Sequence, residues 1–238
     1  MRGGLGRLID FFHHRIRPET PLEALHVAAF DGDEATIKNL IRHKNVDVNI
    51  AISTIMGASI KKTPLFLAVQ EGNISEAKLL IELGADIEVV NSIGITVLME
   101  AASCGDPEAV DLLLNSGAST KFERADDGAT PLSFCTHADI GDLGISQLMA
   151  KLIDAGANVE QPIHAPQSVL MLAARKNLPL AIEVLLRAGA DPDRKCALKW
   201  AKNWTALDHA INERSNEAVE ILTKVTRTPP IARPGLVS

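Results

Sequence analysis

The segment Thr63-Pro-Leu-Phe-Leu-Ala-Val-Gln-Glu-Gly72 decides the fold, because the chain repeats it. A shift of 33 residues gives Thr96-Val-Leu-Met-Glu-Ala-Ala-Ser-Cys-Gly105. Each of the two closing glycines is followed 12 residues later by a second one, in Gly84-Ala-Asp and in Gly117-Ala-Ser. Similarity at a fixed period of this size is the sequence signature of stacked structural repeats.

The same pattern occurs in other parts of the chain. Further copies begin at Glu23, Thr130, Ser168 and Thr205. The first three of these close at Asn49, Gly156 and Gly189, and the last fades after Leu222. Six consecutive units therefore account for most of the sequence.

Each unit is predicted to form two short helices. The first presents Leu at its third position and small Ala residues at its sixth and seventh. The second presents apolar residues at helical spacing, as in Ala77, Leu80 and Ile81. The leading Thr suits a helix N-cap, and Gly84 suits the left-handed residue that ends a helix. Helices this short are not stable alone, so stacking must supply the stability, at about 1.5–3 kcal/mol for each buried Leu or Ile.

These residues resemble the ankyrin repeat family, whose unit reads T-P-L-H-x-A-A-x-x-G, then an apolar helix, then G-A-D-V-N. The resemblance implies an all-α, ankyrin-repeat solenoid of stacked helix-turn-helix units with projecting hairpin-like loops. Residues 1–19 are expected to form an N-terminal capping helix, residues 20–225 the repeat domain, and residues 226–238 a disordered, proline-containing tail. The units are placed near 20–49, 63–88, 96–121, 130–160, 168–193 and 205–225.

Composition and charge exclude several classes of function. No apolar run is long enough for a membrane span, and the first residues lack the features of a secretory signal. The three cysteines are widely spaced and odd in number, which suits a reducing cytoplasm. The formal charge is −6, with −11 between residues 21 and 223. This negative charge disfavours nucleic acid as the partner and favours a protein with a basic surface.

The sequence contains no pattern that indicates catalysis, a cofactor or a metal. His13 and His14 are adjacent, but no Cys or carboxylate joins them at zinc-site spacing. His26 is interpreted as structural, because the family uses this position to hydrogen-bond a neighbouring loop. Cys104 lacks a basic neighbour in sequence that would activate it. Asp126 and Asp127 are interpreted as solvated turn residues. We therefore expect a non-enzymatic protein without cofactors.

The candidate binding residues follow from the fold. In the resembled family, the positions just before each first glycine face the concave side. Both tryptophans lie in one loop, where an exposed Trp is a preferred interface anchor. The candidate protein-binding residues are Phe30, Asp31, Gln70, Glu71, Ser103, Cys104, Arg175, Lys176, Trp200 and Trp204. The charges at these positions either orient a partner or are ordinary solvated charges.

Three departures from the repeat pattern carry alternative interpretations. The long apolar loop 50–62 either packs on its own repeat or contacts a partner. Five extra residues near 138–144 are interpreted as a neutral elaboration between two helices. Trp200 and Trp204 either anchor an interface or pack on the last repeat and seal it.

The sequence as a whole predicts a protein–protein interaction module that is monomeric when unbound. It acts as a scaffold or an inhibitor, through its concave face and loop tips. Two more specific hypotheses are a bacterial immunity protein that neutralises a cognate, basic toxin, and an effector that captures a host target.

Overall fold

The computed structural model describes residues 18, 20–52, 61–160 and 166–231. The capping helix expected over residues 1–19 therefore falls almost entirely outside the described residues. The chain divides into two compact units, Met1–Val97 and Leu98–Ser238. Each unit is described by itself.

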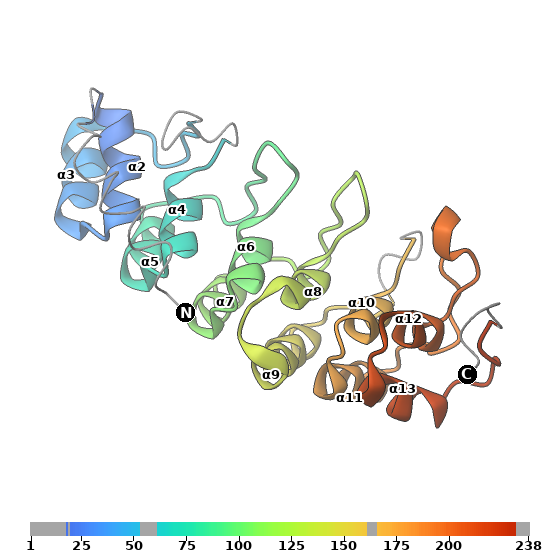
Figure 1. The fold of residues 1–238 in the computed structure, drawn as a ribbon. Coiled ribbons are helices and arrows are strands. Elements are labelled where there is room, and N and C mark those ends of the chain that lie inside the picture. The colour runs from blue at the N-terminus through green and yellow to red at the C-terminus, as the bar shows by residue number, and fades with distance from the viewer. Residues whose placement is uncertain (1–17, 19, 53–60, 161–165, 232–238) are drawn as a thin grey trace. The chain divides into compact units, whose positions relative to one another are not determined.

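The described residues of the first unit form two helix pairs. They are α2 (Pro21–Asp31) with α3 (Glu34–Lys44), and α4 (Pro64–Glu71) with α5 (Ile74–Glu82). The first helices α2 and α4 pack side by side, and so do the second helices α3 and α5 (Figure 1). Leu25, Ile37, Leu65, Phe66 and Leu80 are fully buried between them. Each pair thus covers the apolar face of the next.

The second unit continues the same arrangement. Its first helices are α6 (Val97–Cys104, beginning at the last residue of the first unit), α8 (Pro131–Phe134), α10 (Val169–Arg175) and α12 (Ala206–Glu213). Its second helices are α7 (Pro107–Asn115), α9 (Gly141–Asp154), α11 (Pro179–Arg187) and α13 (Asn216–Thr223). Short 3-10 helices η2 (Cys135–His137) and η3 (Lys199–Ala201) lie in the connections. Here α10 packs against α12, and α11 packs against α9 and α13.

The repeated residues begin and end the helices as expected. The Thr63 hydroxyl accepts a hydrogen bond from the Phe66 amide, so this side chain caps α4. At the other end of the unit, Gly84 has φ of +94°, a left-handed conformation that glycine adopts without strain. The N-cap and glycine predictions are both confirmed.

The loops between helix pairs are hairpin-like. Isolated antiparallel bridges join Ile52 to Lys62 and Val90 to Thr96. In the first unit the loops after α3 and α5 leave the helices on one side, and in the second unit the loops after α7 and α11 also share a side (Figure 1). The described residues form helices and isolated bridges but no strand. The predicted all-α repeat fold is confirmed.

The five extra residues of the fourth unit, near 138–144, fall in the connection after η2 and the first turn of α9. The side chain of Ile140 packs closely on Gly105, where an added Cβ would lie 2.7 Å from Ile140 Cγ2. The Asp142 carboxylate accepts hydrogen bonds from the backbone amides of Leu180 (2.7 Å) and Ala181 (3.1 Å), at the start of α11. The insertion therefore joins neighbouring repeats.

The C-terminal segment is anchored over its first residues. Asp193 accepts hydrogen bonds from the amides of Arg227 and Thr228, and Asp208 accepts one from Ile231 at 2.6 Å. A disordered tail was expected from residue 226 onward, whereas residues 226–231 contact the repeats. Residues 232–238 lie outside the described residues.

Within the described parts of the chain, none of the helices has both the length and the apolar character needed to span a membrane.

Candidate functional site

Seven of the ten candidate residues lie in the last turn of a first helix, and Lys176 directly follows α10. Trp200 lies in η3 and Trp204 in the loop after it. In the first unit, the Asn73 side chain fixes the ends of α2 and α4 relative to each other. Its Nδ2 donates to the carbonyl oxygens of Ala29 (3.0 Å) and Phe30 (2.7 Å). The ends of neighbouring first helices therefore form one continuous surface within this unit.

The first-unit candidates comprise an aromatic residue and members of a small polar network. Phe30 is half-buried and Asp31 is exposed, and both Gln70 and Glu71 are half-buried. The Lys62 ammonium donates to Gln70 Oε1, and Gln70 Nε2 donates to Glu71 Oε1 at 2.8 Å. Gln70 is thus held between a cation and a carboxylate, which fixes the Glu71 side chain at the helix end.

The second-unit candidates on the first helices differ in exposure. Ser103 is half-buried and Cys104 is exposed at the end of α6. At the end of α10, the Lys176 ammonium donates to the Thr136 carbonyl oxygen. Partial burial, together with the nearby charge of Arg175, lowers the pKa of Lys176. Lys176 therefore ties α10 to the preceding repeat.

The two tryptophans form an aromatic cluster with a buried histidine. The Trp200 and Trp204 rings lie edge to face, with centroids 5.4 Å apart. The His209 ring, on α12, lies 5.7 Å from Trp200 and 5.1 Å from Trp204. His209 is fully buried and Trp204 is half-buried, but Trp200 is 54% exposed. Trp204 therefore packs on the last repeat, while Trp200 combines that packing with a face open to solvent.

Arg175 joins this cluster to the ends of the first helices. Its guanidinium carbon lies 5.5 Å from the centroid of the Trp200 ring, within the range of a cation–π contact. Its Nε lies 3.8 Å from Glu213 Oε1, at the end of α12. The structure thus brings the predicted residues Arg175 and Trp200 together, although 25 residues separate them in the sequence.

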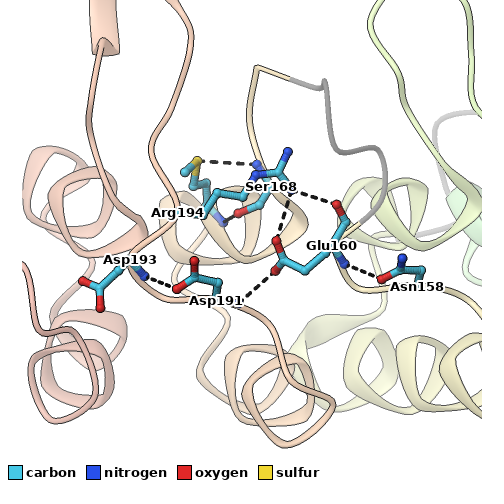
Figure 2. Close-up of polar contacts among 7 residues, drawn as sticks. Asn158, Glu160, Ser168, Asp191, Asp193 and Arg194 are labelled. Carbon is cyan, nitrogen blue, oxygen red and sulfur yellow. Dashed lines mark hydrogen bonds and ion pairs between the residues drawn. The ribbon is translucent and has the colours of Figure 1, made fainter.

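The loop that carries the tryptophans has a defined base. The amide of Cys196 donates to the Trp204 carbonyl at 2.7 Å, and the Asn203 amide donates to the Cys196 carbonyl at 2.9 Å. Arg194 Nη1 donates to the Glu160 carbonyl at 2.9 Å and pairs with the Glu160 carboxylate at 3.4 Å (Figure 2). The same carboxylate accepts from the Asp191 amide at 2.8 Å. Neighbouring loops are therefore linked at their bases.

The long loop 50–62 is only partly described. A pocket of about 170 Å³ lies at its base, lined in part by Ala51, Lys61, Phe66 and Val90. The Lys61 amide donates to Ser92 Oγ at 3.1 Å, which ties the base to the next loop. Residues 53–60 lie outside the described residues, and both interpretations of this loop remain predictions.

His26 takes the structural position expected of it. One ring nitrogen lies 2.8 Å from the Leu22 carbonyl oxygen, and the other lies 3.1 Å from that of Lys62 in the following loop. Asp126 and Asp127 are exposed and lie in a turn, as interpreted from the sequence. Asp127 also pairs with Arg124, through two hydrogen bonds of 2.8 and 2.5 Å. Across the described parts of the chain, no group of three or more His, Cys, Asp or Glu residues is placed to hold a metal ion.

Sequence reasoning left four residues of the second-unit surface out of the candidate set, although Glu213 was among the positions expected on the concave side. Glu213 and His209 contact the predicted residues directly, and the exposed Lys199 and Lys202 flank Trp200 in the same loop. Glu213 was detectable from its place just before the turn after α12. The two lysines were detectable from the run of basic residues around the tryptophans.

Comparison with known proteins agrees with the fold. The family model described as ankyrin repeats (3 copies) matches residues 5–91, and the ankyrin repeat model matches residues 93–122. Both are models of a structural repeat, so they indicate no enzyme family.

Two curated relatives contain a similar segment. Neurogenic locus notch homolog protein 1 of Mus musculus is 30% identical over 191 residues, which is 77% of this chain and 7% of that protein. Ankyrin repeat and KH domain-containing protein mask-1 of Caenorhabditis elegans is 30% identical over 211 residues, which is 87% of this chain and 7% of that protein. The chain therefore spans less than a tenth of the length of these relatives.

A solved structure matches over nearly the full length of its own chain. It belongs to the complex of the Bd0816 predatory endopeptidase with immunity protein Bd3460, from Bdellovibrio bacteriovorus. The TM-score is 0.67 at 27% sequence identity, covering 85% of this chain and 98% of the matched chain.

Proposed function

The chain belongs to the ankyrin repeat family, and we propose that it acts without catalysis, by binding a partner protein through the ends of its first helices and its loop tips. The observation that carries this proposal is the exposed Trp200 with the Arg175 guanidinium against its ring. Large aromatic and Arg side chains supply most of the binding energy in protein interfaces.

The experiment is capture of the partner by the full chain immobilised on a resin, with mass spectrometry of the bound proteins. The double variant Glu71→Ala, Arg175→Ala removes one candidate from each unit. The matched control is Glu82→Ala, Arg187→Ala, which removes the same residue types from the exposed last turns of the second helices α5 and α11.

We expect the first double variant to lose at least about tenfold in affinity for the captured partner, while the control binds as the unchanged chain does. Circular dichroism verifies that both variants stay folded. Equal binding by the two double variants contradicts the proposed surface.

Inhibition of a cognate protein, as by an immunity protein, is the more specific function that we propose. The likeness to a chain in a complex of a predatory endopeptidase with an immunity protein supports it, because the match covers nearly all of the matched chain. Charge adds support, since residues 98–172 hold three basic against eleven acidic side chains, a formal charge of −8. Such a segment attracts a basic surface and repels nucleic acid.

Two measurements test this function. A gene for a toxic hydrolase is expected beside the gene for this chain, and its product should stop growth of a host cell unless the two are expressed together. The purified chain should inhibit that hydrolase at a one-to-one molar ratio. Light scattering should show that the unbound chain is a monomer. If the neighbouring product is harmless or its activity is unaffected by the chain, scaffolding becomes the better function.

The proposed compartment is the cytoplasm. Cys104, Cys135 and Cys196 are all free thiols, and Cys135 and Cys196 are buried apart from each other in the second unit. Cysteines that remain unpaired in the folded chain are typical of a reducing compartment.

A further inference from the structure

Positive charge is concentrated at one part of the second unit. Residues 173–204 hold seven basic against three acidic side chains, a formal charge of +4. The preceding stretch, 98–172, carries −8. The formal charge changes sign near Trp200, which lies in the loop of residues 194–204. We name this loop the tryptophan loop. Figure 1 draws it in orange, between α11 and α12.

The basic side chains of this region differ in whether they already form hydrogen bonds or ion pairs within the chain. Arg194 pairs with Glu160, and the Lys176 ammonium donates to the Thr136 carbonyl oxygen. Lys199 and Lys202, by contrast, are exposed, and no hydrogen bond or ion pair to any residue that the structure describes engages their ammonium groups. The two lysines that flank Trp200 are therefore available to an incoming anion.

Arg175 adds a third cation directed at the same place. Its guanidinium lies against the Trp200 ring, and its Nε–H is buried without a hydrogen-bond acceptor among the described residues. The nearest carboxylate oxygen, on Glu213, is 3.8 Å away, which is too long for a hydrogen bond. A buried donor with no acceptor costs stability, so the contacts that Arg175 already makes do not satisfy its guanidinium.

We propose that the tryptophan loop and Arg175 bind an acidic polypeptide segment of the partner, with an apolar side chain of that segment against the exposed face of Trp200. Carboxylates pair with Lys199, Lys202 and Arg175, where they complete charge-assisted hydrogen bonds. This proposal rests on the proposed function, because it names the chemistry of the partner at one part of that surface.

A short acidic peptide fits this patch better than other anions do. The patch holds one exposed ring with a guanidinium against it and two exposed lysines, one and two residues from Trp200 in the chain, and a stretch of charge −8 lies in the same unit. An extended phosphate backbone or an anionic membrane surface would meet that acidic stretch and be repelled. A polypeptide can instead place acidic residues on the tryptophan loop and basic ones over residues 98–172, and the two signs fix its orientation.

The test begins with selection of random short peptides displayed on phage, using the full chain as bait. We expect the recovered peptides to carry a net negative charge together with at least one large apolar residue. Synthetic versions are then titrated and followed by tryptophan fluorescence. The chain contains two tryptophans and no tyrosine, so this signal comes from Trp200 and Trp204 alone.

Charge reversal identifies the residues responsible. Lys199→Glu, Lys202→Glu should weaken binding of the selected peptides at least about tenfold. The control double variant Lys44→Glu, Lys78→Glu makes the same change in net charge at exposed positions of the first unit. It should leave peptide binding unchanged. Added salt should weaken binding to the unchanged chain, because the contacts are exposed ion pairs.

The outcomes separate this inference from the proposed function. Recovery of neutral or basic peptides, or equal binding by the two double variants, overturns the acidic-segment proposal while leaving protein binding intact. Stronger fluorescence changes with single-stranded DNA or with phosphatidylserine vesicles than with the peptides overturn it in favour of those ligands. If the captured partner also binds the Glu71→Ala, Arg175→Ala variant normally, the proposed surface itself is wrong.

Discussion

At the scale of single residues, burial decides how the polar groups of this chain behave. His26 is fully buried, and both of its ring nitrogens face carbonyl oxygens, on Leu22 and Lys62. A neutral ring has one N–H and can donate to one of them at a time. Burial outweighs the attraction of the two carbonyls for a proton, so the pKa of His26 is lowered.

Stability should therefore fall as the pH is lowered through the ordinary histidine range. In the unfolded chain His26 binds a proton near about pH 6.5, whereas the folded state resists protonation to lower pH. The unfolded state then holds more protons, and the free energy of unfolding declines between about pH 7.5 and about pH 5.5. Burial also lowers the pKa of His137, which acts in the same direction.

Urea unfolding followed by circular dichroism at both pH values measures this effect. The His26→Gln variant should be less stable at the higher pH but lose less stability on acidification. An equal loss in the two proteins would show that His26 does not carry the pH dependence.

The three thiols should differ sharply in reactivity. Cys104 is exposed, whereas burial raises the pKa of Cys135 to about 12 and also raises that of Cys196. Because the thiolate is the nucleophile, only Cys104 should react quickly with Ellman's reagent in the folded protein. The Cys104→Ser variant should react only on addition of denaturant. Fast labelling of Cys135 in the folded chain would contradict the burial seen here.

At the scale of elements, the inserted residues of the fourth repeat have a structural purpose. Helix α11 begins after Leu178, which offers no side-chain cap, and its first amides are instead bonded by Asp142 from the start of α9. A carboxylate at a helix N-terminus satisfies free amides and interacts favourably with the helix dipole. One repeat therefore caps the helix of the next.

Removal of this cap should destabilise the second unit. We expect Asp142→Ala to lower the free energy of unfolding by about 1–2 kcal/mol, as for the loss of an N-cap. Asp139→Ala is the matched control, since Asp139 lies exposed in the same inserted segment, and it should change stability by less than about 0.5 kcal/mol. Denaturant unfolding monitored by tryptophan fluorescence compares the two. Similar effects from both changes would mean that the cap contributes nothing specific.

At the scale of the whole molecule, the two compact units can be followed by different spectroscopic signals. Both tryptophans lie in the second unit, while circular dichroism reports the helices of both. In repeat proteins each unit contacts only its neighbours, so a defect in one part affects distant repeats weakly.

A core defect in the first unit should separate the two signals. Phe66 is fully buried, and Phe66→Ala should cost about 3–5 kcal/mol. We expect an earlier transition by circular dichroism and a smaller shift of the fluorescence transition. Identical shifts of the two curves would show that the units unfold as one.

The sequence by itself determined the repeat fold and the helix boundaries, because both depend on local chemistry. Thr63 caps a helix through its own hydroxyl, and Gly84 ends one through its left-handed backbone. The spacing of apolar residues fixed which face of each helix is buried. These features recur at a fixed period, so the pattern could be read without knowing any long-range contact.

Only the tertiary structure decided what surrounds each candidate side chain. The Arg175 guanidinium lies against Trp200, and Asp142 caps a helix 38 residues away. Exposure and pairing depend on groups that stacking brings together from different repeats. Periodicity identifies the positions that face outward, but the neighbours across a loop are set by the packing of one repeat on the next.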